Sequence, residues 1–189
     1  MKITNTKTIT ITDTATLTTS EMMRHLKETF EVYSYWDYKE LDKEFPKPEN
    51  PTTRTFPLEA ESSAMKGSSW NEMEPIRESM MTLREYILYF EAYHKETGKH
   101  PDAEGWTIFK DRLSDGYVAR GYWYPARRGV RFGWSRPVDR DSCDGARCAV
   151  AISLPPCDSL APSATDETLE ASVASLESDM EKIKKTLIL

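Results

Sequence analysis

The amino-acid sequence predicts an α+β protein in which small domains of helix and antiparallel sheet precede a C-terminal coiled-coil helix. Three observations lead to this fold class. Residues 117–136 contain two runs of aromatic and β-branched residues around a break with Pro and Gly at 125–129, which is typical of a β-hairpin. Two capping-box sequences precede apolar residues at helical spacing. Residues 166–189 carry a heptad repeat.

The distribution of apolar residues predicts compact parts joined by linkers. The chain of 189 residues is long enough for one or two small domains. Its hydrophobic content of 39% is low and uneven, and stretches poor in apolar residues bury too little surface to offset the entropy cost of ordering. We expect an N-terminal strand–helix unit (1–45), a linker (46–81), a central α+β domain with the hairpin (82–140), a second linker (141–165) and a coiled-coil oligomerisation helix (166–189). This division leaves open whether 1–45 and 82–140 share one core.

The N-terminal unit begins with a predicted strand and helix. Residues 3–17 alternate Thr with Ile, which places one residue type on each face of a half-buried strand. Thr18 and Glu21 then fit a capping box at the start of a helix. The buried stripe of this helix consists of residues that recur every four positions, Met22, Leu26 and Phe30.

A second strand and helix complete this unit. The aromatic run at 32–36 predicts a short strand, and Asp37 is placed to cap a helix over 38–45. Aromatic residues between two short helices favour a small core, with a base-stacking surface as the alternative. Prolines after this helix begin the predicted linker, in which Trp70 stands alone and is free to dock on a domain or a partner.

The central domain begins with a second capping box at 82–85. We expect its helix to run to about Glu96, with Gly98 at the position that favours a left-handed residue after a helix. A short apolar run at 105–109 and a turn at 114–116 lead into the hairpin. A helix packed on a small sheet is the simplest arrangement that buries these apolar residues.

The hairpin is the strongly basic and aromatic segment of an acidic chain. It holds five arginines and no Asp or Glu, and because the whole chain carries a net charge of −6, the remainder carries −11. The purely structural interpretation places Trp123, Phe132 and Trp134 in the core and pairs the arginines with nearby acids. The residues that we predict to bind a partner are Arg120, Tyr122, Tyr124, Arg127, Arg128, Arg131 and Arg136.

Two functions from different classes are compatible with this surface. The first is a non-enzymatic protein whose hairpin binds a protein partner, because Arg, Tyr and Trp dominate interface hot spots. The alternative is a nucleic-acid-binding protein, in which arginines contact phosphates and aromatic rings stack on the bases of a single strand, or the β-ribbon enters a duplex groove. The acidic remainder of the chain and its isoelectric point near 5.2 oppose this alternative.

The C-terminal segment predicts self-association. Its apolar residues are spaced 4, 3, 4, 3 and 4 apart, which a straight helix does not keep in register unless it supercoils with a partner. In a parallel dimer Asp179 would face Lys184 of the second copy. A helix docked on its own domain is the alternative, although such a helix usually has a wider apolar stripe. The predicted oligomerisation residues are Leu169, Val173, Leu176, Met180, Ile183 and Leu187.

The sequence contains no compact catalytic motif. No G-x-S-x-G, H-E-x-x-H or Gly-rich phosphate loop is present, so we predict no catalytic residues, no cofactor and no metal. Scattered carboxylates of a metal-dependent nuclease are the alternative. The cysteines at 143, 148 and 157 match no common zinc spacing and are expected to be free thiols, with a metal site that adds His94 or His100 as the other interpretation.

Several short segments of the sequence, taken together, resemble segments found in one group of proteins. They are Ser34-Tyr35-Trp36, Pro51-Thr52-Thr53-Arg54, Thr82-Leu83-Arg84-Glu85, Thr97-Gly98-Lys99-His100 with Gly105-Trp106-Thr107, and the Tyr122-Trp123 hairpin. Over roughly residues 20–136 the chain resembles uncharacterised small accessory proteins of tailed phages and prophages. The resemblance implies a phage or mobile-element protein that binds and modulates a host or phage protein, for example as an inhibitor. With no apolar run long enough to cross a bilayer and no signal peptide, the predicted location is the cytoplasm, which for a phage protein is the host cytoplasm.

Overall fold

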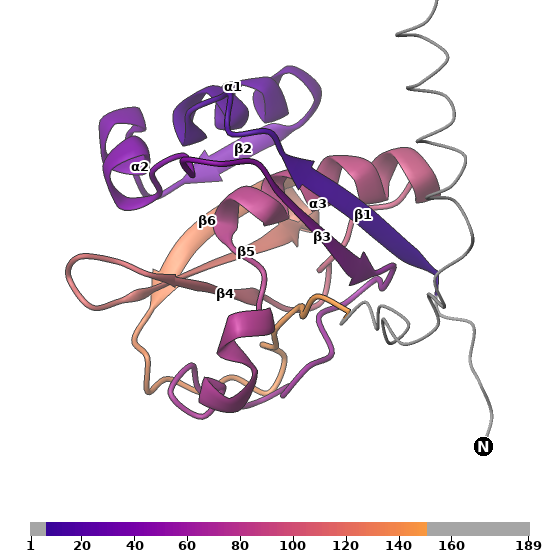
Figure 1. Cartoon of the computed structure of the whole chain (residues 1–189). Coiled ribbons are helices and arrows are strands. Elements are labelled where there is room, and N and C mark those ends of the chain that lie inside the picture. The colour runs from indigo at the N-terminus through magenta and orange to yellow at the C-terminus, as the bar shows by residue number, and fades with distance from the viewer. Residues whose placement is uncertain (1–6, 151–189) are drawn as a thin grey trace, which may run out of the picture. The chain divides into compact units, whose positions relative to one another are not determined.

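The computed structural model describes residues 7–150 and confirms an α+β fold over this range (Figure 1). Residues 1–6 and 151–189 lie outside the described part, and with them the predicted coiled coil. The helices are α1 (Thr19–Thr29), α2 (Tyr38–Glu44) and α3 (Leu83–Thr97). The strands are β1 (Thr8–Asp13), β2 (Glu31–Ser34), β3 (Thr52–Pro57), β4 (Thr107–Arg112), β5 (Val118–Tyr124) and β6 (Gly129–Ser135), and short 3₁₀ helices span Glu74–Ser79 and Pro125–Arg127.

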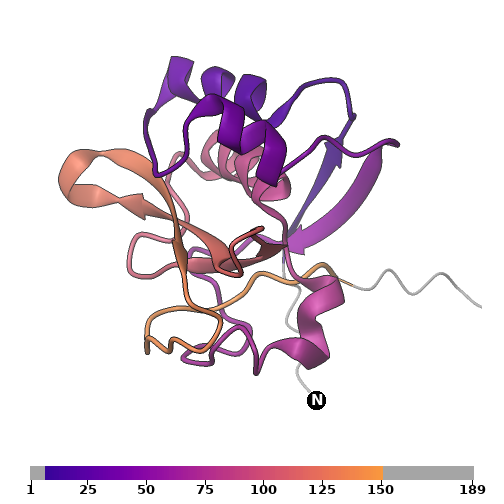
Figure 2. The same cartoon turned by 90° about the vertical axis from the view of Figure 1, so that its left-hand side faces the viewer.

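The strands form a four-stranded sheet and a separate two-stranded ribbon (Figure 2). The order in the larger sheet is β2-β6-β5-β4, and β5 and β6 form the predicted hairpin in antiparallel register. The sheet is mixed rather than antiparallel throughout, because β2 pairs with β6 in parallel. β1 and β3 pair in antiparallel orientation to make the ribbon. The parallel pairing brings the N-terminal unit beside the hairpin.

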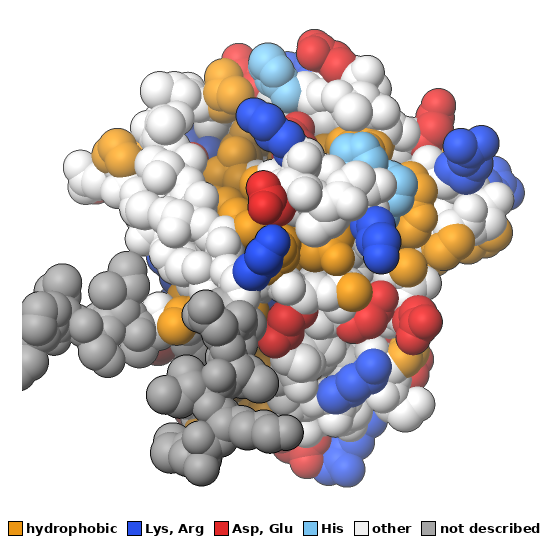
Figure 3. Space-filling view, turned by 90° about the vertical axis from the view of Figure 1, so that its right-hand side faces the viewer, with side chains coloured by type: hydrophobic (Ala, Val, Ile, Leu, Met, Phe, Trp, Pro, Cys, Tyr) orange, Lys and Arg blue, Asp and Glu red, His pale blue; other side chains and the backbone are white. Residues whose placement is uncertain are grey.

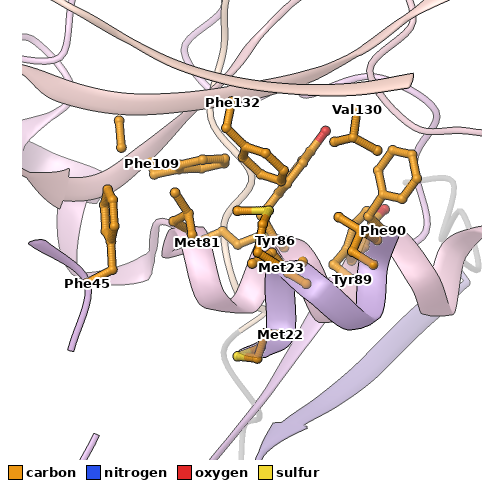
Figure 4. Packing of buried hydrophobic residues seen from close by; sticks show 14 of the residues in the cluster. Met22, Met23, Phe45, Met81, Tyr86, Tyr89, Phe90, Phe109, Val130 and Phe132 are labelled. Carbon is orange, nitrogen blue, oxygen red and sulfur yellow. The ribbon is translucent and has the colours of Figure 1, made fainter. Parts of the chain in front are cut away.

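α3 is the helix around which the core is built (Figure 4). On one side the ring of Tyr86 packs against Phe109 of β4 and Phe132 of β6, with centroids 5.0 and 6.0 Å apart. On another side the ring of Tyr89 meets Phe56 of the ribbon at 6.3 Å. All five side chains are fully buried. α3 therefore lies between the ribbon and one face of the sheet.

The ends of the helices follow the local signals in the sequence. Capping boxes are present at Thr18 of α1, Asp37 of α2 and Thr82 of α3. Gly98 ends α3 with φ of 68°, in the left-handed region that glycine adopts without strain. Each cap satisfies backbone groups that the helix leaves unpaired and contributes about 1 kcal/mol.

The N-terminal unit and the central domain share one core. Ile11 of β1 and Leu26 of α1 belong to the same buried cluster as the α3 and β6 side chains. A buried ion pair between Arg84 of α3 and Asp13 of β1, 2.7 Å long, also joins the two segments. No helix in residues 7–150 combines the length and the hydropathy needed to cross a membrane.

The prediction of a linker over 46–81 is wrong. β3 lies in this range and pairs with β1 along its whole length. A second buried cluster also forms here, in which Trp70, Met73 and Met80 pack against Ile108 and Val118 of the sheet. The Trp70 indole donates a hydrogen bond of 3.1 Å to a backbone carbonyl of β4. The segment has few apolar residues, but they are large and find partners elsewhere in the chain.

The linker predicted for 141–165 is wrong over its described part, residues 141–150. Ala146 bridges to Ala64, and Cys148 bridges to Met80. Arg147 is 2.7 Å from Asp102 in an ion pair whose two side chains are almost fully buried. The rest of this predicted linker lies outside the described residues.

Candidate partner-binding site

The alternation of side chains in the hairpin separates a core face from an outer face. Paired residues of antiparallel strands point to the same side of the sheet. Trp123 pairs with Val130, and their side chains are buried on the side of α3, as is Phe132. The interpretation that the hairpin aromatics belong to the core is thus confirmed for Trp123 and Phe132, whereas the side chain of Trp134 is 44% exposed. The outer face carries Arg120, Tyr122 and Tyr124 of β5 and Gly129, Arg131 and Gly133 of β6.

The outer face of the sheet is covered over only part of its area. Ile108 and Val118 point to this face and are covered by the second buried cluster, which includes Trp70 and Met73. In Figures 1 and 2 the segments that build this cluster lie on the side of the sheet away from α1 and α2. Around Arg131 the side chains of Tyr33, Tyr122 and Tyr124 are half-buried, and that of Tyr35 is exposed. The part of the outer face around Arg131, which the second buried cluster does not cover, is here called the open half of the sheet.

Arg131 lies at the centre of a group of tyrosines on this open half. Tyr33 of β2 is its partner in the parallel register, and Tyr122 of β5 is its partner in the antiparallel register. The Arg131 guanidinium carbon is 5.2 Å from the ring centroid of Tyr35 and 5.8 Å from that of Tyr124. Arg131 also donates a hydrogen bond to the Tyr35 hydroxyl. A pocket of about 300 Å³, here called the tyrosine–arginine pocket, is lined by Tyr33, Ser34, Tyr35, Tyr124, Arg127 and Arg131.

Two glycines on β6 make room for the tyrosine rings. A side-chain carbon at Gly133 would lie 3.0 Å from atoms of the Tyr35 ring. One at Gly129 would lie 2.7 Å from the Tyr33 ring. Arg131 stands between these two glycines, so its outer-face neighbours along the strand have no side chain. The pattern Gly-x-Arg-x-Gly at 129–133 is a sequence signal for this pocket that the sequence analysis did not use.

Two of the predicted binding arginines are neutralised within the protein. The Arg120 guanidinium is 3.0 Å from the Asp144 carboxylate and stacks over the Trp106 ring at 4.2 Å. Arg136 is 2.8 Å from Asp139, outside the tyrosine–arginine pocket. The charge of the hairpin counted from the sequence therefore overstates its unpaired charge.

The other three arginines have no carboxylate partner among residues 7–150. Arg127 and Arg128 are exposed at the hairpin turn, where Arg128 adopts a left-handed conformation with φ of 51°. Hydrogen bonds to tyrosine hydroxyls, Tyr122 first and Tyr35 after it, raise the pKa of Arg131 above its ordinary value. None of these partners is a carboxylate, so no acidic group of residues 7–150 pairs with Arg131.

A second pocket, of about 660 Å³, lies on the other side of the hairpin turn and shares Arg127 with the first. Its wall is a ladder of rings in which His100 stacks on Trp123 at 3.6 Å and on His94 at 4.7 Å. Burial first, and then the charges of His94 and Arg128, lower the pKa of His100. The remaining lining residues of this hairpin-turn pocket are Lys27, Glu28, Thr29, Phe30, Glu31 and Arg128.

The described residues do not bring the histidines and cysteines together. The cluster of possible metal ligands found within residues 7–150 is Asp141, Cys143 and Asp144, and it contains no histidine. The Cys143 thiol donates a hydrogen bond to Asp141, which is the main reason why the pKa of this thiol is raised to about 11. Cys157 lies outside the described residues.

Asp102 and Asp111, two of the carboxylates considered for a metal-dependent nuclease, have structural partners. Asp102 is fully buried, pairs with Arg147 and accepts hydrogen bonds from the backbone of Ser62 and the hydroxyl of Thr107. Asp111 accepts a hydrogen bond of 2.6 Å from the first residue of α3, and burial raises the pKa of its carboxyl to about 6. These contacts give both side chains a structural role.

The structure brings together Tyr124, Arg127 and Arg131 of the predicted binding set, and Tyr122 beside them. It also adds Tyr33, Ser34 and Tyr35, which the sequence analysis placed in a strand of the N-terminal unit. Figure 3 shows another face of the molecule, where basic and acidic side chains are interspersed. The tyrosine–arginine pocket differs, because none of its lining residues in the described part of the chain is acidic. Comparison of the chain with protein-family models, curated proteins and solved structures gave no match.

Proposed function

We propose that the protein is a non-enzymatic accessory protein of a phage or mobile element that binds and modulates a host or phage protein. The tyrosine–arginine pocket is the binding site, and the heptad residues at 169–187 make the protein a dimer. One observation carries the proposal. On the open half of the sheet, a pocket lined by three tyrosines holds two arginines that no carboxylate of residues 7–150 neutralises.

The chemistry of the pocket suits a protein interface. Tyrosine and arginine supply large contact areas and directional hydrogen bonds, and both are enriched among the residues that dominate interface energies. The rings are held in place by their neighbours, with Tyr122 and Tyr124 centroids 5.7 Å apart. A surface that is already ordered loses little conformational entropy when a partner binds.

Nucleic-acid binding is the second candidate, and one observation favours it. A four-stranded sheet that exposes aromatic and arginine side chains on one face is also the arrangement with which some modules stack RNA bases. Here, however, Arg120 and Arg136 are already paired with Asp144 and Asp139. The three remaining arginines provide fewer phosphate contacts than the five that the sequence suggests.

The test is affinity capture of the full-length protein in its host, with and without nuclease, followed by mass spectrometry. Arg131→Gln removes the central charge of the pocket, and Arg136→Gln removes an arginine that already has a partner. We expect a specific protein that survives nuclease treatment, is captured by wild type and Arg136→Gln, and is lost with Arg131→Gln. Partners that disappear with nuclease would favour the nucleic-acid candidate. A partner retained by Arg131→Gln would contradict the proposed site.

A further inference from the structure

We infer that the partner inserts an aspartate or glutamate side chain of an exposed peptide segment into the tyrosine–arginine pocket. This inference rests on the proposed function and specifies the chemistry of the partner. It follows from three features of the pocket and its surroundings: a charge held in a fixed direction, hydrogen-bond donors beside it, and an ion pair that cancels the charge of the neighbouring Arg120.

The guanidinium of Arg131 is preorganised for an oxyanion. The rings of Tyr35 and Tyr124 lie within 5.2 and 5.8 Å of it, which restricts its rotation. The planar fork of a guanidinium matches the two oxygens of a carboxylate, and such charge-assisted pairs are stronger than neutral hydrogen bonds. Because no carboxylate of residues 7–150 lines the pocket, the guanidinium is free to pair with a ligand.

The tyrosine hydroxyls add donors to the same pocket. Tyr35 accepts a hydrogen bond from Arg131, so its own hydroxyl hydrogen is available for a further acceptor. Arg127 lies at the rim, is exposed, and lines both this pocket and the hairpin-turn pocket. A group that only accepts hydrogen bonds and carries negative charge satisfies these donors, and a carboxylate is such a group.

The surroundings favour one acidic side chain over a polyanionic strand. In the adjoining hairpin-turn pocket, Glu28 and Glu31 are accompanied by Lys27 and Arg128, so this side neither adds nor removes much charge. At the other end of the open half, the charge of Arg120 is cancelled by Asp144. A single strand of nucleic acid must place several phosphates in succession, and the strand would meet an already paired arginine when it continued from Arg131 to Arg120. A lone carboxylate needs only the pocket itself.

The size of the pocket agrees with this ligand. Its volume of about 300 Å³ is at the small end of the range found for ligand sites. Such a volume suits one side chain with the adjacent backbone, while the neighbouring tyrosine faces contact the rest of the segment. We therefore expect the acidic residue to be flanked by apolar or aromatic residues that cover these faces.

The inference is tested by selecting random short peptides, in a display library, on the wild-type protein, with counter-selection on Arg131→Gln. We expect the surviving peptides to be enriched in Asp or Glu at one position. Replacing that residue by Asn or Gln in a synthetic peptide should weaken binding at least about tenfold, because a charge-assisted pair is lost. Arg131→Lys should weaken binding less than Arg131→Gln, since it keeps the charge but not the fork.

Gly133→Val is a second variant that keeps every arginine. Its side chain displaces the Tyr35 ring from the strand and should weaken peptide binding as Arg131→Gln does, without affecting residues of the core. Circular dichroism of each variant verifies the fold. Peptides that depend on the pocket but show no acidic preference would overturn the inference and leave the proposed function standing. Oligothymidylate binding that is lost in Arg131→Gln, with no peptide selected, would overturn both.

Discussion

At the scale of single residues, the role of an arginine in this protein depends on the acceptor within its reach. Arg84 and Arg147 are buried and pair with Asp13 and Asp102, each at 2.7 Å. Arg131 is instead surrounded by neutral tyrosines that orient its guanidinium and leave its charge uncancelled. The buried pairs hold segments together, whereas the tyrosine-held arginine is ready to bind an anion.

The His100 ring is expected to make stability depend on pH. Its pKa in the folded protein is lowered, first by burial, and a lowered pKa means that the unfolded chain binds protons more readily. The stabilising contribution is therefore present above the ordinary pKa of histidine, 6.5, and is lost as the pH falls through the lowered value. Relative to a variant without this imidazole, the urea unfolding midpoint of wild type should therefore decrease between pH 7 and pH 5.

The variant His100→Phe isolates this contribution, because a phenyl ring can still stack on Trp123 but does not titrate. We expect its unfolding midpoint to fall less steeply with acid than that of wild type. The charged neighbours in the hairpin-turn pocket remain unchanged: Lys27, Glu28, Glu31, Arg127 and Arg128. The exposed His25→Gln serves as the control and should follow wild type. Equal slopes for His100→Phe and wild type would contradict the prediction.

At the scale of elements, the sequence predicts those whose signals are local. The capping boxes at Thr18 and Thr82 and the glycine at 98 define helix ends through contacts within a few residues, and the structure contains all three. The hairpin is also local, since its two strands are joined by a short turn. β3 was missed because its partner, β1, lies about forty residues earlier in the chain.

The structure of segment 141–150 was also missed by the sequence analysis, because its partners are distant in the chain. Its few apolar residues gave no periodic pattern, yet Arg147 donates to the hydroxyl of Tyr89 and to backbone carbonyls at 59 and 60, as well as to Asp102. A buried polar network of this kind has no hydrophobic signature. Its members are distant in sequence and become neighbours only in the folded chain.

Arg147→Met is expected to destabilise the fold strongly. It leaves the Asp102 carboxylate buried without its cationic partner, which typically costs about 3–5 kcal/mol of unfolding free energy. Urea denaturation measures this loss. Arg140→Met is the matched control, because Arg140 pairs with Glu72 at the surface and should change the free energy by less than about 1 kcal/mol. Equally small effects for both variants would mean that 141–150 behaves as the linker that the sequence predicted.

At the scale of the whole molecule, the candidate site is a product of topology. The sequence directed attention to Arg131 and Tyr124, because they lie within one basic, aromatic hairpin, and the structure places both in the same pocket. Tyr33 and Tyr35 reach the site only because β2 pairs with β6 in parallel, although the two strands lie about a hundred residues apart in the chain. Local patterns contain no information about which strand lies at the edge of the hairpin, so half of the pocket could not be predicted.

A second copy of the chain would double the number of pockets on one particle. Suppose that the heptad residues form a dimer and that the partner carries repeated or paired acidic segments. Binding of one pocket to one segment then raises the effective concentration of the second pocket near the next segment. The affinity of each tyrosine–arginine pocket can then be modest while the dimer binds tightly. This effect makes the oligomeric state part of the proposed function.

The heptad prediction is tested on the full-length chain. Leu176→Asp combined with Ile183→Asp places charges at two seam positions, whereas Ser178→Asp places one at a position that faces solvent in the same repeat. Sedimentation equilibrium should give a dimer for wild type and Ser178→Asp, and a monomer for the double variant with an unchanged near-UV spectrum of residues 7–150. An apolar stripe that docks on its own domain would instead give monomers for all three proteins, with the double variant less stable than the others.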